Sequence, residues 1–249
     1  MTASERQRVQ ALLAWQAAMG ADEAIGEAPF NCFATPAPAA SSLRVTPKPQ
    51  PVSGAGGNGA SQAATLAELE GLVAGFDGCA LKRTAKSLCF ARGREDARIM
   101  LIGEAPGRDE DLQGKPFVGP AGRLLDRMLE AIGLSEEHVY ITNTVYWRPP
   151  GNRMPTPEEV EACAPFLARQ IELLSPRVLM LLGAAAAKSI LRRTEGIMRL
   201  RGRWLIHSCA GRDIPTLATL HPAYLLRNPA DKRLVWRDLL LLKEALEAE

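Results

Sequence analysis

The chain has 249 residues, of which 47% are hydrophobic and 23% charged, and its formal net charge is +2 at pH 7. This composition is ordinary for a globular protein and leaves room for one medium-sized domain. The near-neutral charge excludes binding of nucleic acid through a basic tail, so any DNA contact needs a local face of Arg and Lys. The sequence contains no bilayer-length apolar run, no signal-peptide pattern and only five unevenly spaced cysteines. We therefore expect a protein of the reducing cytoplasm, without a disulfide framework.

The first 62 residues divide into two parts. Apolar residues recur at near-helical spacing between Glu5 and Gly26, which predicts an amphipathic helix within residues 1–28. This helix either docks on the domain that follows or serves as a tethered peptide for a partner. Residues 29–62 are rich in Pro, Ala, Ser and Gly and contain no acidic residue, which is typical of a flexible linker. We expect a single domain over residues 63–249.

That domain begins with a predicted helix at Leu66–Phe76, followed by a short apolar strand at Ile99–Ile102 that ends at Gly103. A polar loop comes next and leads into a helix with an apolar face. The loop holds one large apolar residue, Phe117, and four carboxylates, at Glu104, Asp109, Glu110 and Asp111. Ligand loops of α/β proteins lie at such a strand end, although a solvated connection has the same composition.

Two other uses of this loop do not fit its residues. A phosphate-binding P-loop needs Gly-Lys followed by Ser or Thr, whereas Gly114-Lys115 is followed by Pro116. A calcium loop needs oxygen ligands at alternate positions, with Gly at the sixth and Glu at the twelfth, which this stretch lacks. The sequence therefore predicts neither a hydrolytic nucleotide site nor a calcium site.

Three further strands are predicted at Val139–Val145, Arg177–Leu182 and Leu217–Leu220. The first contains Asn143 near its end, where an Asn either pairs with backbone or contacts a ligand. The second runs into Gly183–Lys188, whose helix N-terminus either holds a phosphate or packs closely on its strand. The third ends at His221. Between the last two strands, the cluster Arg199–Trp204 either faces phosphates or forms a solvated hairpin.

Helices are predicted between these strands, from Thr156 to about Leu174 with a capping box, and from Asp231 to about Leu246. Strands that alternate with helices predict a three-layer α/β/α sandwich around a mainly parallel, four-stranded sheet. Right-handed crossovers place the strand ends at one edge, where four positions meet: Gly103, Asn143, Gly183 and His221. This convergence predicts a single site.

Three segments resemble motifs of the family 4 uracil-DNA glycosylases. Gly103–Leu129 (GEAPGRDEDLQGKPFVGPAGRLLDRML) resembles the first motif, and His221–Pro229 (HPAYLLRNP) resembles the second. Val139–Glu159 (VYITNTVYWRPPGNRMPTPEE) is similar to the central strand and proline-rich loop of that family. The resemblance extends from about Cys79 to the C-terminus. It implies an enzyme that hydrolyses the N-glycosidic bond of uracil in DNA and releases free uracil.

The resemblance also implies a uracil-binding pocket, formed by Gly103, Glu104, Ala105, Phe117, Asn143 and His221. Phe117 would stack on the base. The Asn143 carboxamide can accept from uracil N3–H and donate to O4, whereas cytosine has an acceptor at N3 and an amino group at position 4. His221 would donate to O2, where negative charge develops during cleavage. Glu110 would position or activate water and Glu104 would shape the pocket, with Asp109 as the rival carboxylate, because Ala105 stands where other uracil-DNA glycosylase families have a catalytic aspartate.

We expect DNA to be contacted by the helix N-terminus after the third strand and by residues that push into the base stack after an extruded nucleotide. The expected DNA-binding residues are Gly183, Ala184, Tyr224, Leu225, Leu226 and Arg227. The expected partner is uracil-containing DNA. We expect the protein to act as a monomer and not to bind a membrane. Two other functions stay open: a uracil-DNA binding module with weak catalysis, and an accessory domain associated with a DNA polymerase.

Family members bind a four-iron, four-sulfur cluster through four cysteines, and this chain departs from that pattern. The first and fourth positions are Cys79 and Cys163, but the second is Lys82 and the third is Trp147. Two thiolates cannot supply the four ligands of such a cluster. We therefore expect no cluster, no other metal and no cofactor, with Trp147 filling the volume between the two cysteines.

Overall fold

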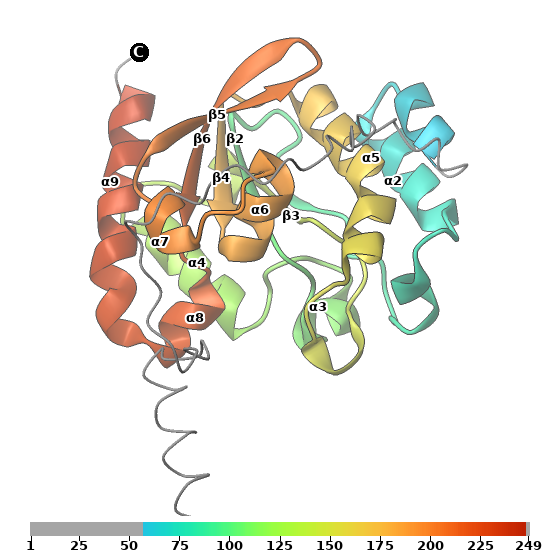
Figure 1. Cartoon of the computed structure of the whole chain (residues 1–249), viewed down its shortest axis with the longest axis horizontal. Helices are drawn as coiled ribbons and strands as arrows, with labels where there is room; N and C mark the ends of the chain where they lie inside the picture. The colour runs from blue at the N-terminus through green and yellow to red at the C-terminus, as the bar shows by residue number, and fades with distance from the viewer. Residues whose placement is uncertain (1–56, 248–249) are drawn as a thin grey trace, which may run out of the picture. The chain divides into compact units, whose positions relative to one another are not determined.

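The structure, a computed structural model, describes residues 57–247 of the chain. They form a central sheet covered by helices on both faces, as the sequence predicts (Figure 1). The helix predicted within residues 1–28 and most of the predicted linker lie outside the described residues. The linker prediction is wrong for its last residues, because η1 (Gly57–Gln62) is a 3-10 helix whose Ala60 is buried in the domain core. The ordered domain thus begins before residue 63.

The sheet of the described residues has six strands rather than the four that we predicted. They are β1 (Arg92–Gly93), β2 (Ile99–Gly103), β3 (Val139–Asn143), β4 (Val178–Leu182), β5 (Trp204–Cys209) and β6 (Arg212–Thr219). Their order in the sheet is β1-β3-β2-β4-β6-β5. The four central strands are parallel and overlap the predicted ones, although β6 begins five residues before its predicted start at Leu217 and β3 ends two residues before Val145. β1 and β5 are antiparallel at the two edges. A two-residue strand such as β1 has no hydrophobic period that a sequence could reveal.

The helical elements alternate with these strands. Besides η1 they are α2 (Leu66–Gly75), η2 (Ala80–Arg83), α3 (Arg108–Gln113), α4 (Pro120–Glu130), η3 (Glu136–His138), η4 (Pro150–Asn152), α5 (Pro157–Leu174), α6 (Ala184–Leu191), α7 (Ile197–Leu200), α8 (Pro222–Arg227), η5 (Pro229–Asp231) and α9 (Lys232–Glu247). Helix α3 lies inside the segment that we predicted as a loop. The sequence did not reveal it because its six mostly charged residues lack apolar periodicity. Within residues 57–247 we find no helix with the length and hydropathy needed to cross a membrane.

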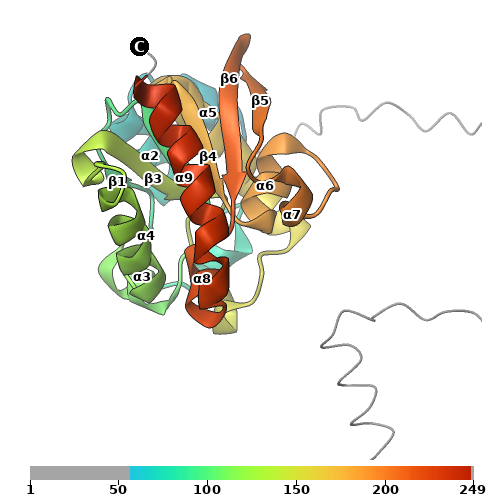
Figure 2. The ribbon, with the colours of Figure 1, turned by 90° about the vertical axis from the view of Figure 1, so that its left-hand side faces the viewer.

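Alternation along the strands builds two cores, one on each face of the sheet. Leu101, Ile141 and Met180 point to the layer of α4, α8 and α9, which faces the viewer in Figure 2. Their neighbours Met100 and Leu179 point to the opposite layer, which contains α5 and α6. Every residue of β2, β3 and β4 is buried, as expected for parallel strands covered on both sides.

A third apolar cluster fills the space between α2, η2, α5 and the segment after β3. It contains Cys79, Cys163 and Trp147, of which Trp147 is 3% exposed and meets the ring of Tyr146 edge-on, with ring centroids 6.2 Å apart. The two cysteine side chains are hydrogen-bonded to each other, and this bond lowers the pKa of the Cys79 thiol below its usual value. The indole is thus buried in the same cluster as the two cysteines.

We predict that Trp147→Ala lowers the free energy of unfolding by about 3–5 kcal/mol, because it removes a buried indole and leaves a cavity. Urea denaturation followed by circular dichroism measures this change. The matched control is Trp236→Ala, since Trp236 is 44% exposed and its truncation should cost less. Equal losses of unfolding free energy in the two variants would mean that the buried Trp147 contributes no more to stability than the partly exposed Trp236.

Candidate functional site

The ends of the parallel strands meet at one edge of the sheet, as predicted. Gly103 at the end of β2 is paired in register with Asn143 at the end of β3. The Gly183 N–H after β4 donates to Thr219 O of β6 at 2.8 Å, and a Cβ on Gly183 would lie 2.9 Å from the Cβ of His221. Of the four predicted positions, Asn143 and His221 line a pocket of about 420 Å³ at this edge, whereas Gly103 and Gly183 lie next to them without lining it.

The pocket contains most of the predicted site. Eight predicted residues line it: Glu104, Ala105, Glu110, Phe117, Asn143, His221, Tyr224 and Arg227. Eight more line it that our candidate list lacks: Pro106, Gly107, Ala121, Pro149, Asn152, Arg153, Met154 and Ala223. Four of these come from the proline-rich stretch after β3. The composition of that stretch is the feature of the sequence that could have identified them.

The side chain of Asn143 is the most unusual feature of the pocket. It is 1% exposed, yet neither its Oδ1 nor its Nδ2 has a hydrogen-bond partner among the described residues. Leaving a buried polar group unpaired destabilises a fold by about 1–3 kcal/mol. An amide in this situation at the edge of a pocket can pair with a ligand that supplies both a donor and an acceptor.

The ring of Phe117 lies over the end of β2. A Cβ on Gly103 would come within 2.5 Å of Phe117 Cζ and 2.4 Å of Asn143 Oδ1, so only glycine leaves room for both side chains. Phe117 itself has φ +56°, which is uncommon for a residue other than glycine. The backbone of α4 comes very close to this residue at Gly122, where a Cβ would lie 1.7 Å from Phe117 O.

His221 caps the N-terminus of α8 and faces the ring of Phe117, with ring centroids 5.6 Å apart. Its Nδ1 accepts the N–H of Ala223 at 3.1 Å. Burial, with a smaller effect from the charge of Arg227, lowers the pKa of His221 to about 4. The imidazole is therefore neutral near pH 7, and because Nδ1 accepts, its proton is on Nε2. A neutral ring in this tautomer can donate one hydrogen bond into the pocket.

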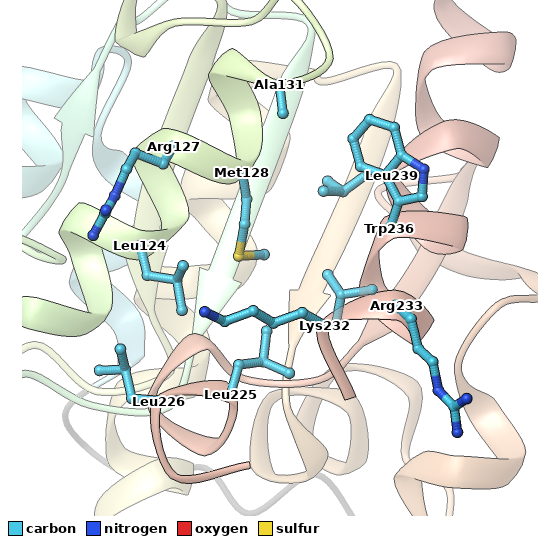
Figure 3. A pocket seen from close by; sticks show the side chains of 11 residues that line it. Leu124, Arg127, Met128, Ala131, Leu225, Leu226, Lys232, Arg233, Trp236 and Leu239 are labelled. Carbon is cyan, nitrogen blue, oxygen red and sulfur yellow. The ribbon is translucent and has the colours of Figure 1, made fainter. Parts of the chain in front are cut away.

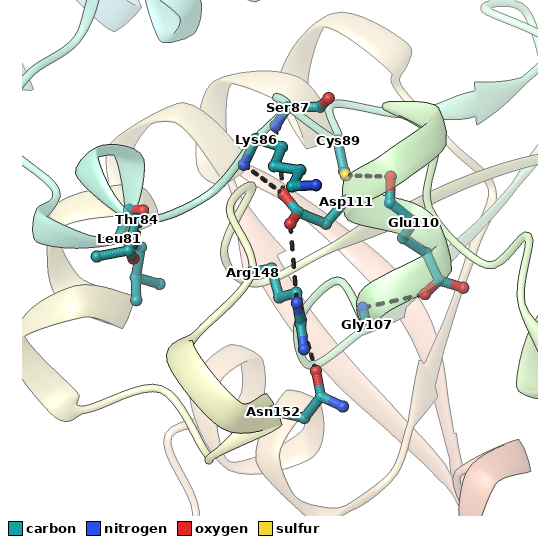
Figure 4. Close-up of polar contacts among 10 residues, drawn as sticks. All are labelled: Leu81, Thr84, Lys86, Ser87, Cys89, Gly107, Glu110, Asp111, Arg148 and Asn152. Atoms are coloured by element: carbon teal, nitrogen blue, oxygen red, sulfur yellow. Dashed lines mark hydrogen bonds and ion pairs between the residues drawn. The ribbon is translucent and has the colours of Figure 1, made fainter.

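Glu110 fastens the loop between β2 and α4 (Figure 4). Its Oε1 accepts the N–H of Gly119 at 2.8 Å, and its Oε2 accepts the N–H of Gly107 at 3.1 Å. One carboxylate thus caps α3 and holds the N-cap residue of α4. Both oxygens keep a further lone pair, so Glu110 can still accept a hydrogen bond from water.

The other two candidate carboxylates differ in position. Glu104 lines the pocket, and its carboxylate accepts no hydrogen bond from the described residues. Burial raises the pKa of Glu104 above its usual value. Asp109 is not a lining residue; its carboxylate lies beside Gly119, with Oδ2 3.1 Å from where a Cβ on that glycine would be. Of these two, only Glu104 lines the pocket.

A polar network supports the side of the pocket that the proline-rich loop forms (Figure 4). Asp111, 3% exposed, accepts the N–H groups of Lys86 and Ser87 at 2.7 and 3.2 Å. It also lies 3.9 Å from Arg148, whose Nε donates to Asn152 at 2.7 Å. The proline-rich loop is thereby joined to α3, and Asp111 supports the site without touching its ligand space.

The same loop has a second anchor. Arg153 forms a two-bond ion pair with Glu159, at 2.6 and 2.8 Å, and this pairing lowers the pKa of the glutamate. Met154 follows and is 69% exposed at the pocket rim. The loop therefore presents exposed groups from a backbone that is held at both ends.

Residues 222–227 form a short helix, α8. Tyr224 and Arg227 line the pocket. Leu225 does not project as predicted: it is fully buried in the core of the α4, α8 and α9 layer, because helical geometry turns it inward. Leu226 is 44% exposed. Gly183 and Ala184 lie at the start of α6, outside the lining of the pocket.

Comparison with known proteins gives a consistent result. The profile of the uracil DNA glycosylase superfamily matches residues 90–240. The type-4 uracil-DNA glycosylase of Saccharolobus solfataricus is 41% identical over 69% of this chain and 82% of its own. Those of Archaeoglobus fulgidus and Pyrobaculum aerophilum are 46% and 40% identical, over 61% and 70% of this chain and 78% and 91% of their own.

We predict that Glu110→Gln lowers the free energy of unfolding by about 1–3 kcal/mol. The reason is that an amide NH₂ cannot accept, so one of the two backbone N–H groups loses its partner. Thermal or urea unfolding at neutral pH measures the loss.

Glu104→Gln is the matched control for this substitution. The Glu104 carboxylate accepts no bond from the described residues and its ionised form is disfavoured by burial. Its replacement should leave stability unchanged or slightly higher. Equal losses in the two variants would mean that the bonds of Glu110 do not hold the loop.

Proposed function

Because the chain belongs to the uracil DNA glycosylase superfamily, we propose that it hydrolyses the N-glycosidic bond of uracil in DNA. Water would add to the sugar carbon, the bond to uracil N1 would break, and free uracil and an abasic site would remain. The type-4 relatives, which this chain covers over most of their length, support the reaction. The substrate would be a uracil nucleotide flipped out of the DNA stack into the pocket.

The observation that carries this proposal is the unpaired amide of Asn143. Uracil offers a donor at N3 and an acceptor at O4, which match the two free atoms of the amide. Cytosine offers an acceptor at N3 and a donor at position 4, so the same amide orientation would face two mismatches. Phe117 would stack on the base beside this edge. The pocket thus discriminates uracil from cytosine through one buried side chain.

Catalysis requires stabilisation of the uracil anion as the bond breaks. We propose that the Nε2–H of neutral His221 donates to O2, the atom where charge develops. Its Nδ1 is already used by the Ala223 N–H, which fixes the tautomer and aims the donor. A neutral donor stabilises the anion without first having to give up a proton.

The carboxylates would act on the sugar and the water. We propose that Glu110 orients the attacking water with its remaining lone pairs, while its two backbone bonds keep it in place. Glu104, which has no such bonds, would lie near the positive charge that develops on the sugar. Asp109 stays the weaker candidate, because it does not line the pocket.

The DNA around the flipped nucleotide would be held by groups at the rim. We propose that Tyr224 and Arg227 contact the strand next to the pocket and that Leu226, rather than buried Leu225, fills the gap in the stack. The amides of Gly183 and Ala184 would hold a phosphate at the start of α6. The protein would act as a monomer in the cytoplasm, consistent with its four described cysteines being free thiols.

The decisive experiment is incubation of the pure protein with a labelled oligonucleotide that contains one uracil, followed by alkali. Cleavage at the uracil, and none at cytosine or thymine in matched oligonucleotides, is the expected result. If no abasic product forms at stoichiometric protein while the uracil oligonucleotide still binds, the chain is a binding or polymerase-associated module instead.

The family's iron-sulfur cluster does not fit the residues of this chain. Lys82 forms an ion pair with Asp77 at 2.7 Å, and the buried indole of Trp147 offers no ligand atom. Cys79 and Cys163 are hydrogen-bonded to each other. Within residues 57–247, no three His, Cys, Asp or Glu side chains are grouped so that they could hold a metal ion. We propose that packing of Trp147 replaces the structural contribution of a cluster.

We predict that protein purified without oxygen is colourless, contains no stoichiometric iron or sulfide, and excises uracil in the presence of a chelator. Iron and sulfide analysis together with a visible absorption spectrum check this prediction. Four iron atoms per chain would overturn it.

We predict that His221→Ala lowers the single-turnover rate of uracil excision by roughly a hundredfold or more, the usual effect of removing one oxyanion donor. Because the pKa of His221 lies near 4, below its ordinary value of 6.5, the ring stays neutral from pH 6 to 8. The rate of the unaltered protein should therefore show no inflection near pH 6.5. Loss of DNA binding alone in the variant would make His221 a positioning residue.

We predict that Asn143→Asp weakens uracil excision, because an ionised carboxylate cannot donate to O4. A protonated carboxyl group pairs better with cytosine, so any gained cytosine excision should increase toward acidic pH. Single-turnover rates on uracil and cytosine oligonucleotides across pH test both effects. Unchanged uracil kinetics would remove Asn143 from base recognition.

A further inference from the structure

A second pocket, separate from the site, lies between α4, α8 and α9 (Figure 3). This α4–α9 groove has a volume of about 450 Å³ and shares no lining residue with the site pocket. Helix α8 separates the two: Tyr224 and Arg227 line the site, whereas Leu225 and Leu226 line the groove. The groove is therefore not an extension of the uracil pocket.

The floor of the groove is apolar. It is formed by Leu124 and Met128 of α4, Leu225 of α8, and Val235 and Leu239 of α9. These side chains belong to the core of that layer or pack against it, so the floor is rigid. Leu226 and Trp236 also line the groove, and each is 44% exposed. The groove thus presents exposed apolar side chains, as expected for a surface that meets another protein.

The charged residues of the groove have a single sign. Arg127, Lys232 and Arg233 line it and are exposed, and no acidic residue does so. Arg127 Nε donates to the carbonyl of Arg123, and no carboxylate within residues 57–247 pairs with Lys232 or Arg233. Three cations on one apolar groove stand out in a chain with a net charge of only +2.

We propose that the α4–α9 groove binds an acidic segment of a partner protein through two or three large apolar side chains. The apolar anchors would cover the floor and Trp236, while flanking Asp and Glu residues would meet Arg127, Lys232 and Arg233. An amphipathic helix laid between two helices uses these anchors at i, i+3 or i+4 and i+7. A DNA backbone fits less well, because phosphates match the cations but carry nothing to cover the apolar floor.

The test uses the full chain and a fluorescein-labelled synthetic peptide of about 15 residues, long enough for marginal helicity. The peptide carries Asp and Glu on one face and Leu and Phe on the other, and fluorescence anisotropy at low salt measures its binding. Two control peptides replace either the acidic residues with Lys or the apolar anchors with Ala. Only the first peptide should bind, and its affinity should fall as salt rises.

Two variants locate the binding surface. Arg233→Glu reverses an exposed charge and Trp236→Ala removes an exposed aromatic; each should raise Kd roughly tenfold or more, as for residues that dominate an interface. Lys188→Glu is the matched control, since it makes the same charge change on α6, at the opposite face of the sheet, and should leave Kd unchanged. Because Arg233 is exposed, its variant should fold even if the Trp236 variant is destabilised.

Three results would overturn the proposal: no binding of the acidic peptide, equal binding of the lysine peptide, or binding that Arg233→Glu leaves unchanged. If Arg233→Glu instead weakens binding of uracil-free duplex DNA while no peptide binds, the groove is part of the nucleic-acid surface. None of these readouts depends on excision, so failure of the proposed enzymatic function leaves the test valid.

Discussion

The hydrogen bonds of one carboxylate determine the geometry on which the site depends. Glu110 accepts the N–H groups of Gly107 and Gly119, so a single side chain joins the start of α3 to the start of α4. Between these points the chain must pass through Phe117 with a positive φ, under a helix that only glycine at position 122 allows so close. The ring of Phe117 then lies over Gly103 beside Asn143. These two hydrogen bonds restrict the conformation of a mostly polar loop and so help to keep the ring of Phe117 over the pocket.

The sequence reveals the parallel strands and the side chains at their ends, for a physical reason. Strands buried on both faces read as continuous apolar runs, and Asn143 and His221 interrupt or follow such runs. The same logic fails for the edges of the sheet. β1 has two residues, and none of the six residues of β5 is buried, so neither shows the apolar pattern of a central strand.

Roles that depend on packing or on backbone partners cannot be read from sequence. Nothing in the order of residues tells that Leu225 turns into the core while Leu226 faces solvent, since this follows from the helical path of α8. Nor does it tell that the carboxylate of Glu110 meets two backbone amides whereas that of Glu104 meets none. Asp111 reads as one more acid of a charged loop, yet it is almost fully buried and joins three segments. The spacing of residues in the sequence reveals which residues belong to the site, but not which contacts each of them makes.

The unpaired amide of Asn143 also has a consequence for the protein without its substrate. A buried side chain with two unsatisfied atoms destabilises the free protein, and proteins have only about 5–15 kcal/mol of net stability. A base that paired with both atoms, as we propose, would remove this penalty when it binds. Selection for a more stable fold would favour an apolar residue at position 143, and selection for function opposes it. Under the proposed function, this trade-off between stability and activity would be located at one side chain at the end of β3.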